Sequence, residues 1–195
     1  MSPRGLSAID RQKRQADLMR RVRYAARLAL QVAVFIALAS LFFLRAPQVE
    51  GRSMLPGVQS GDHVLINTLA YGIALGPWVV ARTSVRRGDI IAFERGQGDD
   101  TKTFLKRVIA LPGEHVEIRD GIVWVAGDPL VTPATILPDS STMKALVVPS
   151  AMVFVLGDNR AESDDSRTFG PVAQSSIIGK ALFVIWPIMH VKRIR

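Results

Sequence analysis

The hydrophobic positions of this chain follow two patterns. Residues 28–44 read LALQVAVFIALASLFFL, which is 17 consecutive positions without a charge, and Arg27 and Arg45 stand on either side. After residue 45, apolar residues occur in short runs, some alternating with polar residues, and Gly, Pro and Asp separate these runs. The long run predicts a helix that crosses a membrane, and the short runs predict strands.

The predicted membrane helix is short for a bilayer. At 1.5 Å per residue it spans about 25 Å, against about 30 Å of hydrocarbon core, and flanking arginines can snorkel to cover the difference. A buried core helix is one alternative, but only Gln31 and Ser40 interrupt the apolar run. A cleaved signal peptide is another, but Arg45-Ala46-Pro47-Gln48 is a poor cleavage site. We therefore predict an uncleaved signal anchor at residues 28–44.

The short apolar runs predict a mainly β domain after the anchor. Asp120-Gly121 separates Val116-Glu-Ile-Arg from Ile122-Val-Trp-Val, and an Asp-Gly pair between two strands indicates a tight hairpin. Strands are expected at residues 64–66, 90–93, 104–110, 116–118, 122–125, 153–156 and 177–184. The expected fold is a single N-terminal transmembrane helix followed by an antiparallel β-rich domain at residues 45–195.

The charge is concentrated before the anchor. The net charge of the chain is +8, and residues 1–27 hold eight basic and two acidic side chains. By the positive-inside rule this basic segment is cytoplasmic, and residues beyond the anchor are extracytoplasmic. A basic arm that binds nucleic acid is the alternative interpretation of these arginines. Because most of the charge lies beside the apolar run, we expect a lipid bilayer as the partner and no nucleic acid.

Metal and thiol chemistry are not expected. The chain has no cysteine, which excludes disulfides, thiol catalysis and cysteine zinc sites. His63, His115 and His190 are scattered and are not spaced as a pair of metal ligands. We predict neither a metal nor another cofactor.

Two segments hold candidates for nucleophilic chemistry. Ser53 lies in Gly51-Arg52-Ser53-Met54-Leu55-Pro56, where turn residues can hold a serine exposed, although most such serines only make turns. Lys106 lies in a predicted strand that has apolar residues on both faces, and burial lowers the pKa of a lysine. A neutral amine can serve as a general base. A lysine that snorkels or pairs with a carboxylate is the alternative.

A third segment is a dense polar loop that follows the apolar run at residues 152–156. It reads Gly157-Asp-Asn-Arg-Ala-Glu-Ser-Asp-Asp-Ser-Arg-Thr-Phe-Gly-Pro171. A polar loop that leaves a buried strand is a common way to place side chains at a site, and a solvated surface loop is the alternative.

Taken together and in this order, the three segments and Gly61-Asp-His-Val-Leu resemble the type I signal peptidases, the bacterial Ser-Lys proteases of the S26 type. The resemblance covers about residues 28–187. It implies a membrane-bound endopeptidase that removes signal peptides from secreted preproteins through an acyl-enzyme, and that meets the export translocon in passing. It also implies a small β excursion at about residues 119–149. The alternative is a non-catalytic, signal-peptidase-like membrane protein that binds exported chains.

The resemblance also implies a role for individual residues. Ser53 matches the nucleophile, Lys106 the general base, and Ser163 the serine that orients the lysine. The matched ion pairs that support the site are Asp158 with Arg107 and Asp165 with Arg167. The positions that match small substrate pockets, which select sites of the Ala-x-Ala type, are Val49, Met54, Val58, Phe104 and Leu105.

One position departs from some members of the family. Where these members have a serine whose hydroxyl helps to hold the oxyanion, this chain has Gly51. Other members also have glycine here, so we expect activity, but the second oxyanion donor is not identified by the sequence. Loss of one such donor can cost roughly 2.7–4 kcal/mol in other enzymes.

Overall fold

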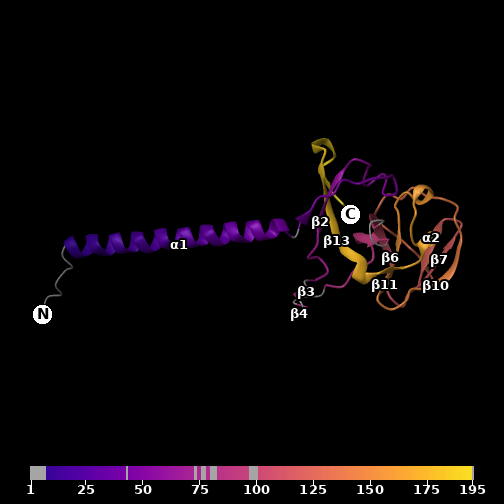
Figure 1. Cartoon of the computed structure of the whole chain (residues 1–195), viewed down its shortest axis with the longest axis horizontal. Coiled ribbons are helices and arrows are strands. Elements are labelled where there is room, and N and C mark those ends of the chain that lie inside the picture. The colour runs from indigo at the N-terminus through magenta and orange to yellow at the C-terminus, as the bar shows by residue number, and fades with distance from the viewer. Residues whose placement is uncertain are drawn as a thin grey trace. The chain divides into compact units, whose positions relative to one another are not determined.

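The computed structural model describes residues 8–42, 44–72, 74–75, 78–79, 83–96 and 101–194. The chain divides into two units, Met1–Phe42 and Phe43–Arg195. Each unit is described by itself (Figure 1).

The described residues of the first unit form the helix α1, Ala8–Phe42. The predicted anchor at residues 28–44 overlaps the end of this helix, but Phe43 and the side chains of Ile36, Ala37 and residues 39–42 lie outside the described residues. Among the residues that are described, no helix combines the length and the apolar character needed to span a bilayer. The structure therefore does not support the predicted transmembrane helix.

The second unit is built around an antiparallel sheet, as the short apolar runs predict. The strand order is β1-β2-β13-β5-β6-β11-β12, with β14 paired to β13. The strands of this sheet are β1 Leu44–Arg45, β2 His63–Asn67, β5 Ile90–Arg95, β6 Lys102–Ala110, β11 Met152–Leu156, β12 Val172–Ala173, β13 Ile177–Trp186 and β14 Lys192–Arg193. The prediction of a mainly β, antiparallel domain is confirmed.

A second sheet has the order β10-β7-β8-β9. Its two middle strands, β7 and β8, form the predicted hairpin, in which Arg119 pairs with Ile122 and the turn residues Asp120 and Gly121 both have positive φ. Positive φ at both positions is what a tight two-residue turn requires. The strands are β7 His115–Arg119, β8 Ile122–Val125, β9 Asp128–Pro129 and β10 Met143–Val147; a separate pair joins β3 Ala74–Leu75 and β4 Trp78–Val79.

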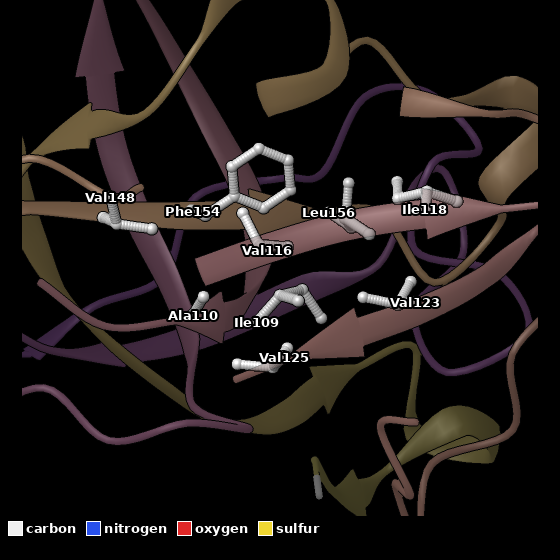
Figure 2. Close-up of a cluster of buried hydrophobic side chains, with 9 residues drawn as sticks. All are labelled: Ile109, Ala110, Val116, Ile118, Val123, Val125, Val148, Phe154 and Leu156. Carbon is white, nitrogen blue, oxygen red and sulfur yellow. The ribbon is translucent and has the colours of Figure 1, made fainter. Parts of the chain in front are cut away.

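A hydrophobic cluster joins the two sheets. Alternate residues of β7 and β8, Val116 with Ile118 and Val123 with Val125, are buried, whereas the residues between them are more exposed. Figure 2 shows these side chains gathered with others from the main sheet. Burial of each large apolar side chain contributes about 1.5–3 kcal/mol. The remaining members of the cluster are Ile109, Ala110, Val148, Phe154 and Leu156.

Strand β6 is covered on both faces, as the sequence predicts. Ile109 belongs to the cluster of Figure 2, whereas Val108 on the opposite face packs in a separate cluster with Phe93 and Val155. Two cations in the middle of the strand are consequently buried, and Lys106 and Arg107 are each 3% exposed. A buried charge needs compensation or a changed pKa, so this strand is where chemistry is concentrated.

The other helical segments among the described residues are short. They are the 3-10 helices η2 Arg160–Glu162, η3 Gln174–Ser176 and η4 Ile188–His190, and the α-helix α2 Ser166–Phe169. The polar loop at residues 157–171 contains η2 and α2, and it contacts the sheet through a hydrogen bond from the N–H of Val155 in β11 to the Oγ of Ser166 in α2.

Candidate active site

Ser53 lies in a tight turn that begins after β1. Within the turn, the N–H of Leu55 donates to the carbonyl of Arg52, and the N–H of Val58 donates to that of Met54. Met54 and Val58 are buried and pack against residues of the main sheet, and this packing holds the turn in place. Ser53 is left half-buried at the surface of this turn.

Lys106 meets Ser53 across the fold. Its Nζ and the Ser53 Oγ form a hydrogen bond of 2.6 Å, although the two residues are 53 positions apart in the sequence. Burial lowers the pKa of Lys106 below its usual value, and the negative charges of Asp165 and Asp164 oppose this only in part. A lowered pKa favours the neutral amine, which can accept the proton of the serine hydroxyl.

The turn at residues 157–159 holds the nucleophile from a second side. The N–H of Asn159 donates to the carbonyl of Ser53 at 2.9 Å, and its side-chain amide donates to the carbonyl of Arg52 at 3.2 Å. No role was predicted for Asn159, and its only signal in the sequence is its place in the polar loop after a buried strand.

Gly157 is packed too closely for a side chain. A Cβ at this position would lie 2.5 Å from the carbonyl oxygen of Ser53 and 2.3 Å from the Oγ of Ser163. Any other residue would therefore displace the nucleophile or the loop. Sequence reasoning also missed this residue, because nothing local in the sequence shows which backbone approaches it.

The structure brings Ser163 into the same site. Its Oγ is buried, and in the described part of the chain it has no hydrogen-bond partner. No hydrogen bond joins it to Lys106 among the described residues, so its role in orienting the lysine stays a prediction. An unsatisfied buried hydroxyl costs free energy, which makes a partner at some stage of the reaction favourable.

A buried ion pair lies beneath the site. The guanidinium of Arg107 donates to both carboxylate oxygens of Asp158 at 2.7 Å, and the two side chains are only 4% and 3% exposed. Arg107 also donates to the carbonyl of Gly88 at 2.9 Å. Arg107 and Lys106 are adjacent on β6, and Asp158 lies in the turn at residues 157–159 that contacts Ser53. The ion pair therefore connects the strand that carries Lys106 to this turn.

The second expected pair is also formed. Arg167 donates to Asp165 at 2.8 Å and to Asp139 at 2.6 Å, and Asp165 is fully buried. Burial alone lowers the pKa of Arg167, but hydrogen bonds and the charges of the two carboxylates outweigh it and raise the pKa. Asp165 also accepts the N–H of Gly157 at 3.0 Å, so this pair fixes the polar loop. Asp139 was not identified from the sequence, because it lies in the excursion far from the loop.

A groove of about 460 Å³ leads to Ser53 and Lys106. One wall is formed by residues 47–50 and the other by residues 102–106 of β6. Of the predicted pocket residues, Val49, Met54, Phe104 and Leu105 line it. Val58 does not line the groove and is completely buried beneath it.

The arrangement fits nucleophilic attack on an acyl group. A hydroxyl is hydrogen-bonded to a buried amine in the lining of a largely apolar groove, and two ion pairs hold the neighbouring loop. In the described residues no group of three or more His, Cys, Asp or Glu side chains is placed to hold a metal ion.

Comparisons with known proteins find several similar sequences. The family model described as "Signal peptidase, peptidase S26" matches residues 21–186. A probable signal peptidase I-1 of Synechocystis sp. is 39% identical over 81% of this chain and 80% of its own length. A signal peptidase I of Bacillus caldolyticus is 36% identical over 78% of this chain and 85% of its own length. A solved signal peptidase I from Enterococcus faecalis V583 is 38% identical and matches 50% of this chain and 97% of that chain, with a TM-score of 0.40.

Proposed function

The chain belongs to the S26 family of signal peptidases and is a serine protease that removes signal peptides, and we propose that Ser53 is its nucleophile and Lys106 its general base. The observation that carries this proposal is the 2.6 Å hydrogen bond between Ser53 Oγ and the buried Lys106 Nζ. The non-catalytic alternative is set aside because the family is one of peptidases.

In the proposed mechanism the proton moves between two atoms. Neutral Lys106 accepts the Ser53 proton as Oγ attacks the carbonyl carbon of the scissile bond. The lysine then gives this proton to the leaving amine, so that the C–N bond breaks and the acyl-enzyme remains. Lys106 then takes a proton from a water molecule, which attacks the ester carbonyl. The proton passes to Ser53 Oγ as the ester bond breaks, and this restores both residues.

The proposed oxyanion donor is the backbone N–H of Ser53. Gly51 offers no hydroxyl for a second hydrogen bond, and its φ of +89° is a conformation that suits glycine. The hydrogen bond from the side-chain amide of Asn159 to the carbonyl of Arg52 supports this assignment, because that carbonyl shares a peptide plane with the N–H of Ser53.

We propose that the groove selects small residues at the first and third positions before the cut. Val49, Met54 and Leu105 supply apolar walls to the groove that Ser53 also lines, and apolar walls favour alanine over charged side chains. A bulky or charged residue at either position is expected to lower kcat/KM by about 10–100-fold. A set of peptides that differ only at these two positions tests this.

We further propose that the enzyme works at a membrane, with residues 1–27 cytoplasmic, residues 28–44 as anchor and residues 45–195 extracytoplasmic. The uncharged run and the basic segment before it support this.

In the catalytic unit, exposed Trp186, Ile188 and Met189 lie close in the chain to the exposed cations of β14, which pairs with β13. These apolar and basic side chains would suit an anionic lipid surface. Protease added to intact spheroplasts should digest the catalytic unit; its full protection would contradict this topology.

The function is tested by incubating the full chain in detergent with a preprotein and mapping the new N-terminus. Ser53→Ala and Lys106→Ala should each abolish cleavage, and the double variant should be hardly worse than either, because the two residues act as a unit. Ser84→Ala and Lys144→Ala are matched controls at exposed positions outside the groove and should cleave normally. Cleavage by a folded Lys106→Ala variant would contradict the proposed base.

A further inference from the structure

Two charged side chains stand beside the nucleophile outside the groove. Arg52, the residue before Ser53, forms an ion pair of 3.4 Å with Glu162 of η2. Their side chains are 66% and 49% exposed, and neither residue lines the groove. An ion pair this exposed contributes little to folding, so the stability of the fold does not account for its position.

The backbone on both sides of this pair is held firmly. The carbonyl of Arg52 accepts hydrogen bonds from the Leu55 N–H and from the side chain of Asn159. Glu162 ends the short helix η2, where its own N–H donates to the carbonyl of Asn159 at 3.2 Å. Exposed, charged side chains are therefore presented from fixed positions next to Ser53.

The path of a substrate brings it to this pair. Ser53 and Lys106 line the groove, which the proposed function assigns to the residues before the cut, so the residues after the cut continue on the other side of the scissile bond. An extended peptide advances about 3.3 Å per residue, which places the first two residues after the cut within about 7 Å of the scissile bond. A long side chain on the residue next to the nucleophile can reach that distance.

We propose that Arg52 is a specificity-determining residue that favours acidic side chains in the first two positions after the cut. This inference rests on the proposed function of the Ser53 and Lys106 site. A guanidinium is always charged and binds a carboxylate through two parallel hydrogen bonds, which a water-exposed glutamate such as Glu162 can release to a substrate. The substrate carboxylate thus takes the place of Glu162 on Arg52, or binds Arg52 together with it.

The neighbouring acids make the direction of each change predictable. Glu162 and the exposed Asp164 both lie near the site, and the charge of Asp164 acts on Lys106. Removal of the Arg52 charge leaves these two acids, so the preference should turn toward basic residues. Removal of the Glu162 charge frees Arg52, so the preference for acidic residues should become stronger.

The test uses the full chain in detergent and three peptides that share one Ala-x-Ala site and differ only in the two residues after it: Glu-Glu, Gln-Gln or Lys-Lys. For each enzyme, kcat/KM is expressed relative to the Gln-Gln peptide. The unmodified enzyme should favour Glu-Glu over Gln-Gln by about two- to fivefold, the range of an exposed ion pair. This preference should fade at about 1 M salt, where the screening length is about 3 Å.

The variants then separate the two charges. Arg52→Gln should lose the preference for Glu-Glu and cleave Lys-Lys better than Gln-Gln, whereas Glu162→Gln should raise the Glu-Glu ratio. Arg87→Gln, which removes an exposed ion pair with Glu114 away from the groove, is the matched control and should keep the ratios of the unmodified enzyme.

The inference would be overturned if the unmodified enzyme cleaved all three peptides with the same kcat/KM, or if Arg52→Gln kept the preference for Glu-Glu. Cleavage of the Gln-Gln peptide in the same experiment would still uphold the proposed function. Failure of the folded enzyme to cleave any of the three peptides would overturn the proposed function and this inference with it.

Discussion

Replacement of Lys106 by methionine should abolish cleavage and change how stability depends on pH. Methionine keeps a long, unbranched side chain in a position that is only 3% exposed, and it removes the titrating amine. The hydrogen bond to Ser53 is lost as well. The variant therefore isolates the free energy associated with holding a lysine in this strand.

The sign and size of the change follow from proton binding. Burial lowers the pKa of Lys106 in the folded chain, whereas an unfolded lysine titrates at about 10.4. Between these two pKa values the unfolded state binds a proton that the folded state does not, so stability rises with pH. Relative to Lys106→Met, the free energy of unfolding of the unmodified chain should rise by up to about 1.4 kcal/mol per pH unit in this window. Outside the window the difference should be constant.

The measurement is urea unfolding in one detergent at several values between about pH 7 and 10, near and below the ordinary lysine pKa. Lys144→Met, at an exposed position of β10, is the control and should follow the unmodified chain. If the curves of the unmodified chain and Lys106→Met run parallel, the pKa of Lys106 is not lowered across this range. The argument for a neutral lysine as base would then be wrong.

Three further outcomes are expected from the site. Asp158→Ala leaves Arg107 buried without its carboxylate and should lower the free energy of unfolding by about 3–5 kcal/mol in urea titrations; a loss below about 1 kcal/mol would contradict a buried pair. Gly157→Ala brings a Cβ within 2.5 Å of the Ser53 carbonyl and should lower kcat by about 10–100-fold, which steady-state kinetics can measure. Ser163→Ala should stay folded by circular dichroism and lose less activity than the roughly 10²–10⁴-fold attributed to a general base; unchanged kinetics would exclude a role for its hydroxyl.

The mainly β fold and the pairing of one hairpin were predicted from local patterns in the sequence. In β7 and β8 the alternation of apolar residues and the Asp-Gly turn are local signals, and the hairpin forms where they place it. Strand β6 was also predicted to be covered on both faces, because both faces are apolar. The predicted membrane span is not supported by the described residues.

The pocket residues show where local patterns stop being informative. Val49 and Val58 are both apolar residues near Ser53, yet one lines the groove and the other is buried beneath it. Which of them faces the groove depends on the path of the turn at residues 51–58. That path is set by the turn's own hydrogen bonds and by its packing against the sheet. Neither produces a repeating pattern of residues from which it could be predicted.

What the sequence alone determined is the set of chemical groups and the strands that bear them. Ser53, Lys106 and the acidic and basic residues of the polar loop are recognisable in the sequence because turn residues and apolar runs frame them. Only the tertiary structure decided that Lys106 Nζ lies 2.6 Å from Ser53 Oγ, that Gly157 touches the nucleophile's backbone, and that Asp139 joins Arg167. The reason is physical: strand periodicity and turn chemistry act over a few neighbouring residues. Contacts between distant segments, and the burial that lowers the pKa of Lys106, arise only when β6 is enclosed between β5 and β11.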